Sequence, residues 1–226
     1  MVFAQIPVAS DTIANSSSID SITVFDLILK GGYFMLPIFI LSFVAVYIFV
    51  ERIQTLKKAS KTPEGFLEGI KDSVLKGNMD SAKMTCAQTD TPIARMIEKG
   101  IERIGSPLKN IEVSIENVGK IEIYRLEKNL SLLATISGAA PMLGFLGTVT
   151  GMIQAFIAIA QEEGSVSPKL LSEGIYEAMI TTAAGLIVGI IAYLGYNYLV
   201  TRVQKLVHSM EYNSVEFVDL LQEPNH

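Results

Sequence analysis

Three long uncharged stretches constrain this chain more than any other feature of its sequence. They cover residues 33–50, 130–160 and 178–201. A helix needs roughly 20 apolar residues to cross about 30 Å of hydrocarbon, and each stretch is close to or above that length. Half of all residues are hydrophobic and the mean hydropathy is +0.40, which favours a membrane protein over an ordinary soluble domain. The sequence therefore predicts an all-α membrane protein with three transmembrane helices.

The basic residues predict how these helices are oriented. Of 18 Lys and Arg residues, 14 lie between positions 51 and 128. Basic residues concentrate on the cytoplasmic side of membrane proteins, so this region and the C-terminus are predicted to be cytoplasmic, with the N-terminus outside. We expect this order: an external tail and interfacial helix over 1–32, transmembrane helices over 33–50, 129–160 and 177–201, a cytoplasmic helical region over 51–128, an external loop over 161–176, and a cytoplasmic C-terminal helix over 202–226.

The apolar pattern continues beyond the second and third spans. Ile111, Ile115 and Val118 recur at helical spacing and lead into the second span without a Gly or Pro breaker from position 120 to its start. The pattern predicts one helix from about 109 to 160, around 75 Å long at 1.5 Å per residue. A similar stripe follows the third span, at Val203, Leu206, Val207, Met210, Phe217 and Leu220. Helices two and three are thus expected to extend into a cytoplasmic helical bundle.

Small residues are concentrated in the second and third spans. Small side chains let two helix backbones approach closely, which matters where lipid tails compete for apolar contacts. Pro141 removes one backbone hydrogen bond and predicts a kink. We assign six residues to helix packing rather than to chemistry: Pro141, Gly144, Gly147, Gly151, Gly185 and Gly189.

Polar residues in or beside the same two spans are the candidates for an ion pathway: Thr148, Glu177, Thr181 and Thr182. A carboxylate well inside a bilayer costs at least about 2.5 kcal/mol, so Glu177 either faces a polar cavity or lies at the external interface. A hydroxyl in a membrane helix usually donates to the carbonyl one turn earlier. The residues alone therefore favour local backbone hydrogen bonds for Thr148 and Thr182.

Three stretches resemble the ExbB/TolQ/MotA family of ion-driven motor subunits. The first is Gly31-Gly-Tyr-Phe-Met-Leu-Pro37 leading to Val50-Glu-Arg52, the second is Ala139-Ala-Pro-Met-Leu-Gly-Phe-Leu-Gly-Thr-Val149, and the third is Gly174-Ile-Tyr-Glu-Ala-Met-Ile-Thr-Thr-Ala183. The first is more similar to ExbB than to TolQ. The chain departs from the family pattern at Thr150, where many relatives carry Trp, and at Thr181, where Ala is usual.

The resemblance implies a homo-oligomeric ring, pentameric in this family, in the bacterial inner membrane with a periplasmic N-terminus. The ring would enclose an ExbD-like single-span partner whose intramembrane Asp carries protons, and would energise a TonB-like protein for outer-membrane transport. The resemblance also implies that Thr148, Glu177 and Thr182 face the central pore. The Thr181–Thr182 doublet leaves open which hydroxyl lines it.

Other functions find less support in the sequence. A TolQ-like motor for envelope integrity is the first alternative, and a structural scaffold or a solute transporter is a weaker one, since no internal repeat of the kind expected in a transporter is visible. The chain lacks Trp and has no basic patch with interleaved aromatics, so no nucleic-acid partner is expected. No nucleophile–base pair, phosphate loop or metal-ligand spacing occurs, and Cys86 is the single cysteine. We expect neither an enzyme nor a cofactor or metal site.

Overall fold

The computed structural model describes residues 32–63, 65–161 and 168–222. Most of the predicted external tail and part of the predicted 161–176 loop lie outside these ranges. Within them the structure is helical, with no strand. The helices are α2 (Met35–Ala59), α3 (Phe66–Leu75), α4 (Met79–Gln88), α5 (Pro92–Glu102), α6 (Leu108–Leu126), α7 (Leu130–Gln161) and α8 (Pro168–Gln222).

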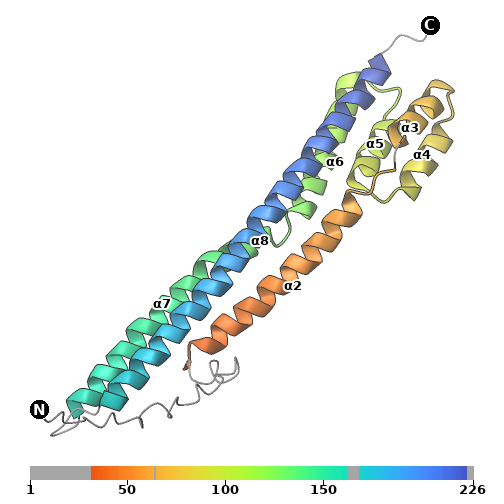
Figure 1. The fold of residues 1–226 in the computed structure, drawn as a ribbon. Helices are drawn as coiled ribbons and strands as arrows, with labels where there is room; N and C mark the ends of the chain where they lie inside the picture. The colour runs from red at the N-terminus through yellow and green to blue at the C-terminus, as the bar shows by residue number, and fades with distance from the viewer. Residues whose placement is uncertain (1–31, 64, 162–167, 223–226) are drawn as a thin grey trace, which may run out of the picture.

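The helices form an elongated molecule with two ends of different construction. At one end α7 and α8 run antiparallel, with α2 packed against both (Figure 1). At the other end α5 packs against α6 and the C-terminal part of α8, while α3 packs against α8 and α4 packs against α3 and α5 (Figure 1). Three helical stretches are long and apolar enough to cross a membrane: Met35–Ala59, Leu108–Gln161 and Gly174–Gln222. The predicted all-α fold with three candidate transmembrane helices is confirmed.

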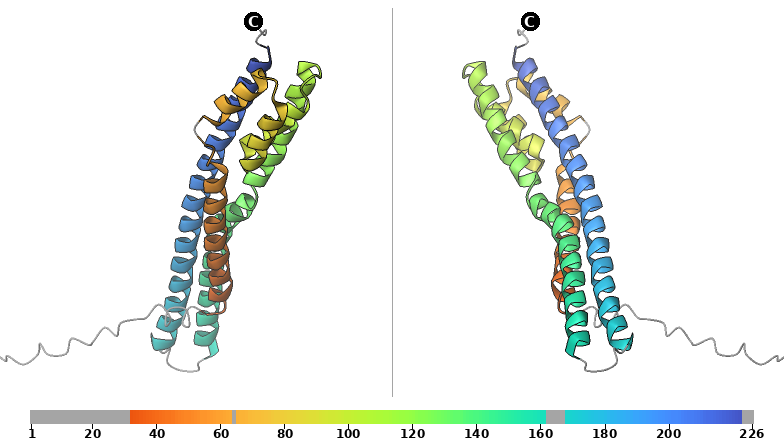
Figure 2. Two further views of the ribbon diagram at one scale, coloured as in Figure 1. Left: turned by 90° about the vertical axis from the view of Figure 1, so that its right-hand side faces the viewer. Right: turned by 90° about the vertical axis from the view of Figure 1, so that its left-hand side faces the viewer.

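The prediction of one uninterrupted helix from 109 to 160 is wrong. Helix α6 ends at Leu126 and α7 begins at Leu130. Between them Asn129 has φ +63°, a left-handed conformation that Asn tolerates better than most residues. The guanidinium of Arg52 on α2 donates to the carbonyl oxygen of Arg125 at 3.1 Å and satisfies a carbonyl in the last turn of α6. As a result α6 leans away from the line of α7 (Figure 2).

Helix α8, in contrast, continues without a break. Its 55 residues span about 80 Å at 1.5 Å per residue, so it takes part in both ends of the molecule. Helix α7 also runs through Pro141 as one helix. The kink expected there remains a prediction.

Outside the membrane-spanning part the helices bury large apolar side chains. Phe217 from α8, Ile115 from α6 and Ile97 from α5 are almost fully enclosed. Helix α5 begins where the Thr91 hydroxyl accepts a hydrogen bond from the Ala94 N–H at 3.4 Å, and its Pro92 occupies the first turn, where its missing N–H does not interrupt the helix. The shared apolar core holds α5 against α6 and α8.

Candidate functional site

The two candidate membrane helices α7 and α8 meet through their backbones. A Cβ atom added at Gly144 would lie 3.0 Å from the carbonyl oxygen of Thr181, and one added at Gly185 would lie 2.5 Å from that of Ala140. Real Cβ atoms are seldom or never found at such distances, so any larger residue would push the helices apart. The contact therefore depends on the glycines, as expected where close packing must replace the hydrophobic effect.

The other small residues lie along the same line of close contact between α7 and α8, which we call the seam. A Cβ at Gly147 would meet the Thr181 methyl group at 2.6 Å, and one at Gly151 would meet the Ala178 side chain at 3.2 Å. Gly189 lies against the ring of Pro141. All six residues assigned to helix packing from the sequence are therefore placed between α7 and α8 of one chain.

The adjacent threonines of α8 differ in their surroundings. Thr181 is 1% exposed, and its hydroxyl donates to the carbonyl of Glu177 in its own helix at 2.7 Å while its methyl group covers Gly147. Thr182 is half-buried, and its hydroxyl donates across the seam to the carbonyl of Gly144 at 2.9 Å. Neighbouring residues on a helix point about 100° apart. Helix α7, which packs on one side of α8, therefore encloses Thr181 and leaves Thr182 half-buried.

The hydroxyls of α7 bond within their own helix. Thr148, which is half-buried, donates to the carbonyl of Phe145 at 2.6 Å, and Thr150 donates to that of Leu146 at 2.9 Å. The residues alone favoured local hydrogen bonds for Thr148 and Thr182. The structure has one at Thr148, whereas Thr182 bonds to the other helix.

The carboxylate of Glu177 lies beside the start of α2. It is close enough to Gly32 that a Cβ there would overlap the Glu177 Oε1 atom, and Gly32 has φ +66°. Helix α2 has no side-chain cap and no acidic residue in its first turn. A negative charge near the N-terminal end of a helix is favourable, so Glu177 from α8 can supply what α2 lacks. The structure thus places Glu177 where α8 meets α2.

Comparison with known proteins identifies the family to which these helices belong. The sequence profile of the MotA/TolQ/ExbB proton channel family matches residues 88–212, more than half of the chain. The chain belongs to the MotA/TolQ/ExbB proton channel family. The match covers α5, α6, α7 and most of α8, and includes the four candidate ion-pathway residues. The chain is therefore a non-enzymatic, multi-pass member of a membrane transport family.

Two ExbB proteins align with most of this chain, and a TolQ protein aligns with less than half of it. A putative biopolymer transport protein ExbB homolog of Methanothermobacter thermautotrophicus is 29% identical over 194 residues, which is 84% of this chain and 67% of that protein. The biopolymer transport protein ExbB of Neisseria meningitidis serogroup B is 27% identical over 74% of this chain and 80% of its own length. The Tol-Pal system protein TolQ of Haemophilus influenzae is 36% identical over 98 residues, covering 43% of this chain and 41% of that protein. The similarity to these ExbB proteins extends further along the chain.

The transmembrane helices of this family member expose large apolar side chains on their outer faces. They include Leu36, Phe39, Phe43 and Tyr47 on α2, Met142, Phe145 and Phe156 on α7, and Met179, Ile187, Ile190 and Leu194 on α8. Apolar surface of this extent is expected where a chain faces lipid or other membrane helices rather than water.

Sequence reasoning missed a buried ionic cluster beside the membrane-spanning part. The Glu122 side chain is 3% exposed and accepts from Arg95 and from Arg125, each at 2.7 Å. Arg95 also pairs with Asp90, which accepts from Lys58 at 2.8 Å. The hydrogen bond from Lys58 lowers the pKa of Asp90, and the bond to Glu122 raises the pKa of Arg95. The cluster joins α2, α5 and α6.

The remaining candidates for chemistry are the Cys86 thiol and side chains that could bind a metal ion. Burial raises the pKa of the Cys86 thiol to about 12, so this side chain stays protonated at neutral pH and is a poor nucleophile. Within the ranges that the structure covers, no group of three or more His, Cys, Asp or Glu side chains is arranged to hold a metal ion.

Proposed function

We propose that this chain is an ExbB-like proton-channel subunit of a bacterial inner membrane. Its copies would form a pentameric ring around an ExbD-like single-span partner with an intramembrane Asp, and would use the proton motive force to energise a TonB-like protein for outer-membrane transport. The observation that carries the proposal is the α7–α8 seam, in which half-buried Thr148 and Thr182 lie on two close-packed helices of a proton channel family member. Family membership favours this function over a structural scaffold or a solute transporter.

The hydrogen bonds of the two threonines suggest how they act. Each hydroxyl has one hydrogen, and here it is donated to a backbone carbonyl, that of Phe145 for Thr148 and that of Gly144 for Thr182. What remains on each oxygen is acceptor capacity. An acceptor favours a protonated carboxyl group over a carboxylate, because only the protonated form can donate. We therefore assign to Thr148 and Thr182 the binding of the partner's Asp in its neutral form.

The energy available from the membrane potential is similar to the cost of placing a carboxylate in the membrane. Moving one charge through 100 mV is worth about 2.3 kcal/mol, and placing a bare carboxylate in a membrane costs about 2.5 kcal/mol or more. A site that favours the protonated Asp would let the carboxyl group stay in the apolar part of the ring. Release of its proton would then be tied to movement toward water.

The other two candidate residues receive different assignments within the same proposal. Glu177 would lie at the external mouth of the pathway, where its carboxylate is beside the start of α2. Thr181, enclosed between α7 and α8, would support the pore wall from behind. Of the doublet, Thr182 would thus be the pore-lining hydroxyl.

The threonines can be tested by replacing each with Val, which has nearly the same shape but no hydroxyl. Thr148→Val combined with Thr182→Val should abolish growth on a nutrient imported through the outer membrane, while co-purification with the partner is retained. Thr150→Val is the matched control, because Thr150 lies on the same helix and also bonds to its own backbone. Wild-type growth of the double variant would contradict the proposed pathway.

The proposed topology places the N-terminus in the periplasm and the C-terminus in the cytoplasm, and rests on the concentration of basic residues in 51–128. A Cys introduced at Ser165 should react with a membrane-impermeant thiol reagent in intact cells, whereas one at Ser106 should react only after lysis. Reaction at Ser106 in intact cells would reverse the orientation.

A TolQ-like function in envelope integrity is the second candidate. It is favoured by the 36% identity to the Haemophilus influenzae TolQ over 98 residues. Deletion of the gene separates the two functions. Loss of nutrient import with normal detergent resistance supports the ExbB-like function, and the opposite pattern supports the TolQ-like one.

A further inference from the structure

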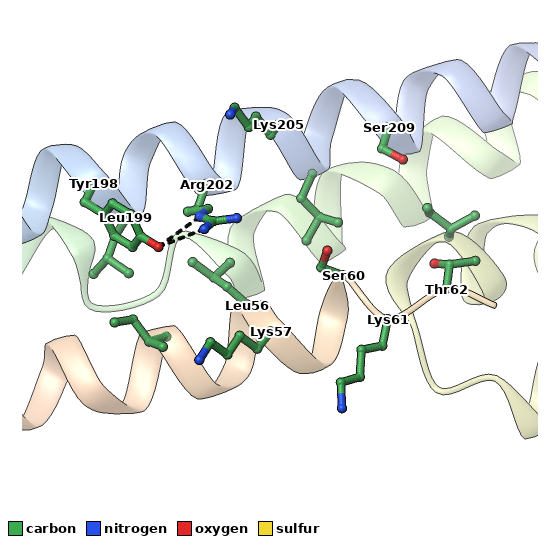
Figure 3. Close-up of a pocket in the computed structure, with 13 residues that line it drawn as sticks. Leu56, Lys57, Ser60, Lys61, Thr62, Tyr198, Leu199, Arg202, Lys205 and Ser209 are labelled. Carbon is green, nitrogen blue, oxygen red and sulfur yellow. Dashed lines mark hydrogen bonds between the residues drawn. The ribbon is translucent and has the colours of Figure 1, made fainter. Parts of the chain in front are cut away.

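A cavity of about 550 Å³ lies between the C-terminal end of α2 and α8, where the membrane-spanning part meets the helical region that follows it (Figure 3). Four basic residues line it: Lys57 and Lys61 from α2 and the segment after it, and Arg202 and Lys205 from α8. No acidic residue is among the described residues that line the cavity. The cavity is therefore bordered by positively charged residues from both helices.

These cations are not neutralised within the described part of the chain. None of the four forms an ion pair with a described carboxylate, whereas the adjacent Lys58 pairs with Asp90 at 2.8 Å. Arg202 donates to the phenol oxygen of Tyr198 from its Nε and Nη2 atoms at 3.1 and 2.9 Å, and lies 5.2 Å from the centre of that ring. Tyr198 thus orients a guanidinium without compensating its charge, which leaves that charge available to an anionic ligand.

A second cavity lies next to the first, on the side of the membrane-spanning part. It measures about 310 Å³, and its lining consists of apolar residues and Tyr198, which also lines the first cavity. Val46 and Phe49 form one side, and Ile191, Leu194 and Gly195 the other. Between Ile191 and Arg202, α8 rises about 16 Å, so the apolar cavity follows the helix into the segment that would face hydrocarbon.

We propose that the two cavities together bind one anionic phospholipid. Its phosphate would lie among the four cations, and an acyl chain would follow the apolar cavity between α2 and α8. Basic pockets between membrane helices are established binding sites for anionic head groups, and Tyr is favoured at the membrane interface where Tyr198 joins the cavities. A free phosphate ion would use the first cavity only. The proposal does not depend on the proposed proton-channel mechanism.

The test measures lipid binding to the delipidated full-length protein in detergent by native mass spectrometry. Phosphatidylglycerol and phosphatidylcholine with the same acyl chains are compared, and the wild type should bind phosphatidylglycerol at least tenfold more tightly. Lys57→Gln combined with Arg202→Gln should weaken phosphatidylglycerol binding roughly 25-fold, as expected for two cations near a membrane surface. Lys76→Gln combined with Lys109→Gln removes the same charge from exposed positions outside both cavities and should change nothing.

A second pair of variants separates a lipid from a free anion. Val46→Phe should fill the apolar cavity and weaken phosphatidylglycerol binding, whereas Val50→Phe, one turn along α2 and outside both cavities, should not. Millimolar inorganic phosphate should fail to displace the lipid. Equal binding of the two lipids, or displacement by phosphate together with normal binding to Val46→Phe, would overturn the proposal. Lys205→Gln, with its thermal unfolding measured in parallel, repeats the charge test if the double variant does not fold.

Discussion

The two ends of the molecule achieve close packing in opposite ways. In the α7–α8 seam the contact is made by glycines, and at Gly144 and Gly185 the space that a Cβ would need is taken by backbone atoms of the other helix. Around α5 and α6 the contact is made by large side chains such as Phe217 and Ile115, and Gly100 is used to admit the Phe217 ring. The difference follows from the solvent. In water, burying large apolar groups stabilises the fold, whereas in lipid only close contact and hydrogen bonds distinguish protein from surroundings.

The two regions also differ in their polar side chains. The cluster around Glu122 lies where α5 and α6 meet the C-terminal end of α2, and the seam instead contains hydroxyls bonded to backbone carbonyls. Helix α8 belongs to both regions without a break, whereas α6 and α7 are separated at the border between them. The chain therefore changes direction between α6 and α7 at the boundary between the two regions.

The largest effect is expected in the seam. Gly185→Leu should prevent α7 and α8 from associating, because even a Cβ at this position would lie 2.5 Å from the Ala140 carbonyl oxygen. The expected result is loss of folded protein in detergent, measured by size-exclusion chromatography and circular dichroism. Gly138→Leu is the matched control, since nothing lies within 4 Å of a Cβ there. If Gly185→Leu behaves like Gly138→Leu, the seam does not depend on glycine.

A smaller effect is expected in the ionic cluster. Glu122→Gln should reduce stability by about 2 kcal/mol, because Arg95 and Arg125 lose charge-assisted hydrogen bonds in a buried setting. Glu116→Gln removes an exposed pair with Lys120 and should change stability by no more than about 0.5 kcal/mol. Thermal unfolding of both variants checks the difference. Equal shifts would mean that burial of Glu122 contributes nothing.

The smallest effect is expected at the border. Asn129→Val should destabilise the break between α6 and α7 by about 1 kcal/mol, because a β-branched residue is strained at φ +63°. Asn129→Gly should leave stability within about 0.5 kcal/mol of the wild type, since Gly adopts this conformation freely. Thermal unfolding again provides the measurement. A Val variant as stable as the Gly variant would show that the left-handed residue is not required there.

Some properties of this protein could be predicted from local sequence alone. The three candidate spans follow from uninterrupted apolar composition, which is read over about 20 residues without knowledge of the partners. Glycines such as Gly144 and Gly185 could be assigned to packing because small residues in lipid have few other uses. The break at Asn129 could not be predicted, because no Gly or Pro marks it, and a carbonyl at the end of α6 is satisfied by Arg52, which lies 73 residues from Arg125.

What only the tertiary structure decided is which neighbour each side chain meets. The sequence placed Thr181 and Thr182 together, but the position of α7 encloses the first and lets the second bond across the seam. In the sequence Glu122 is one of many acidic residues in a charged region. Only the packing of α5 against α6 brings Arg95 to it. Composition determines which segments leave water, because the free energy of moving a segment out of water is approximately a sum over its residues. Pairing is set by the direction in which each helix presents its side chains, and that direction has meaning only once the helices are packed.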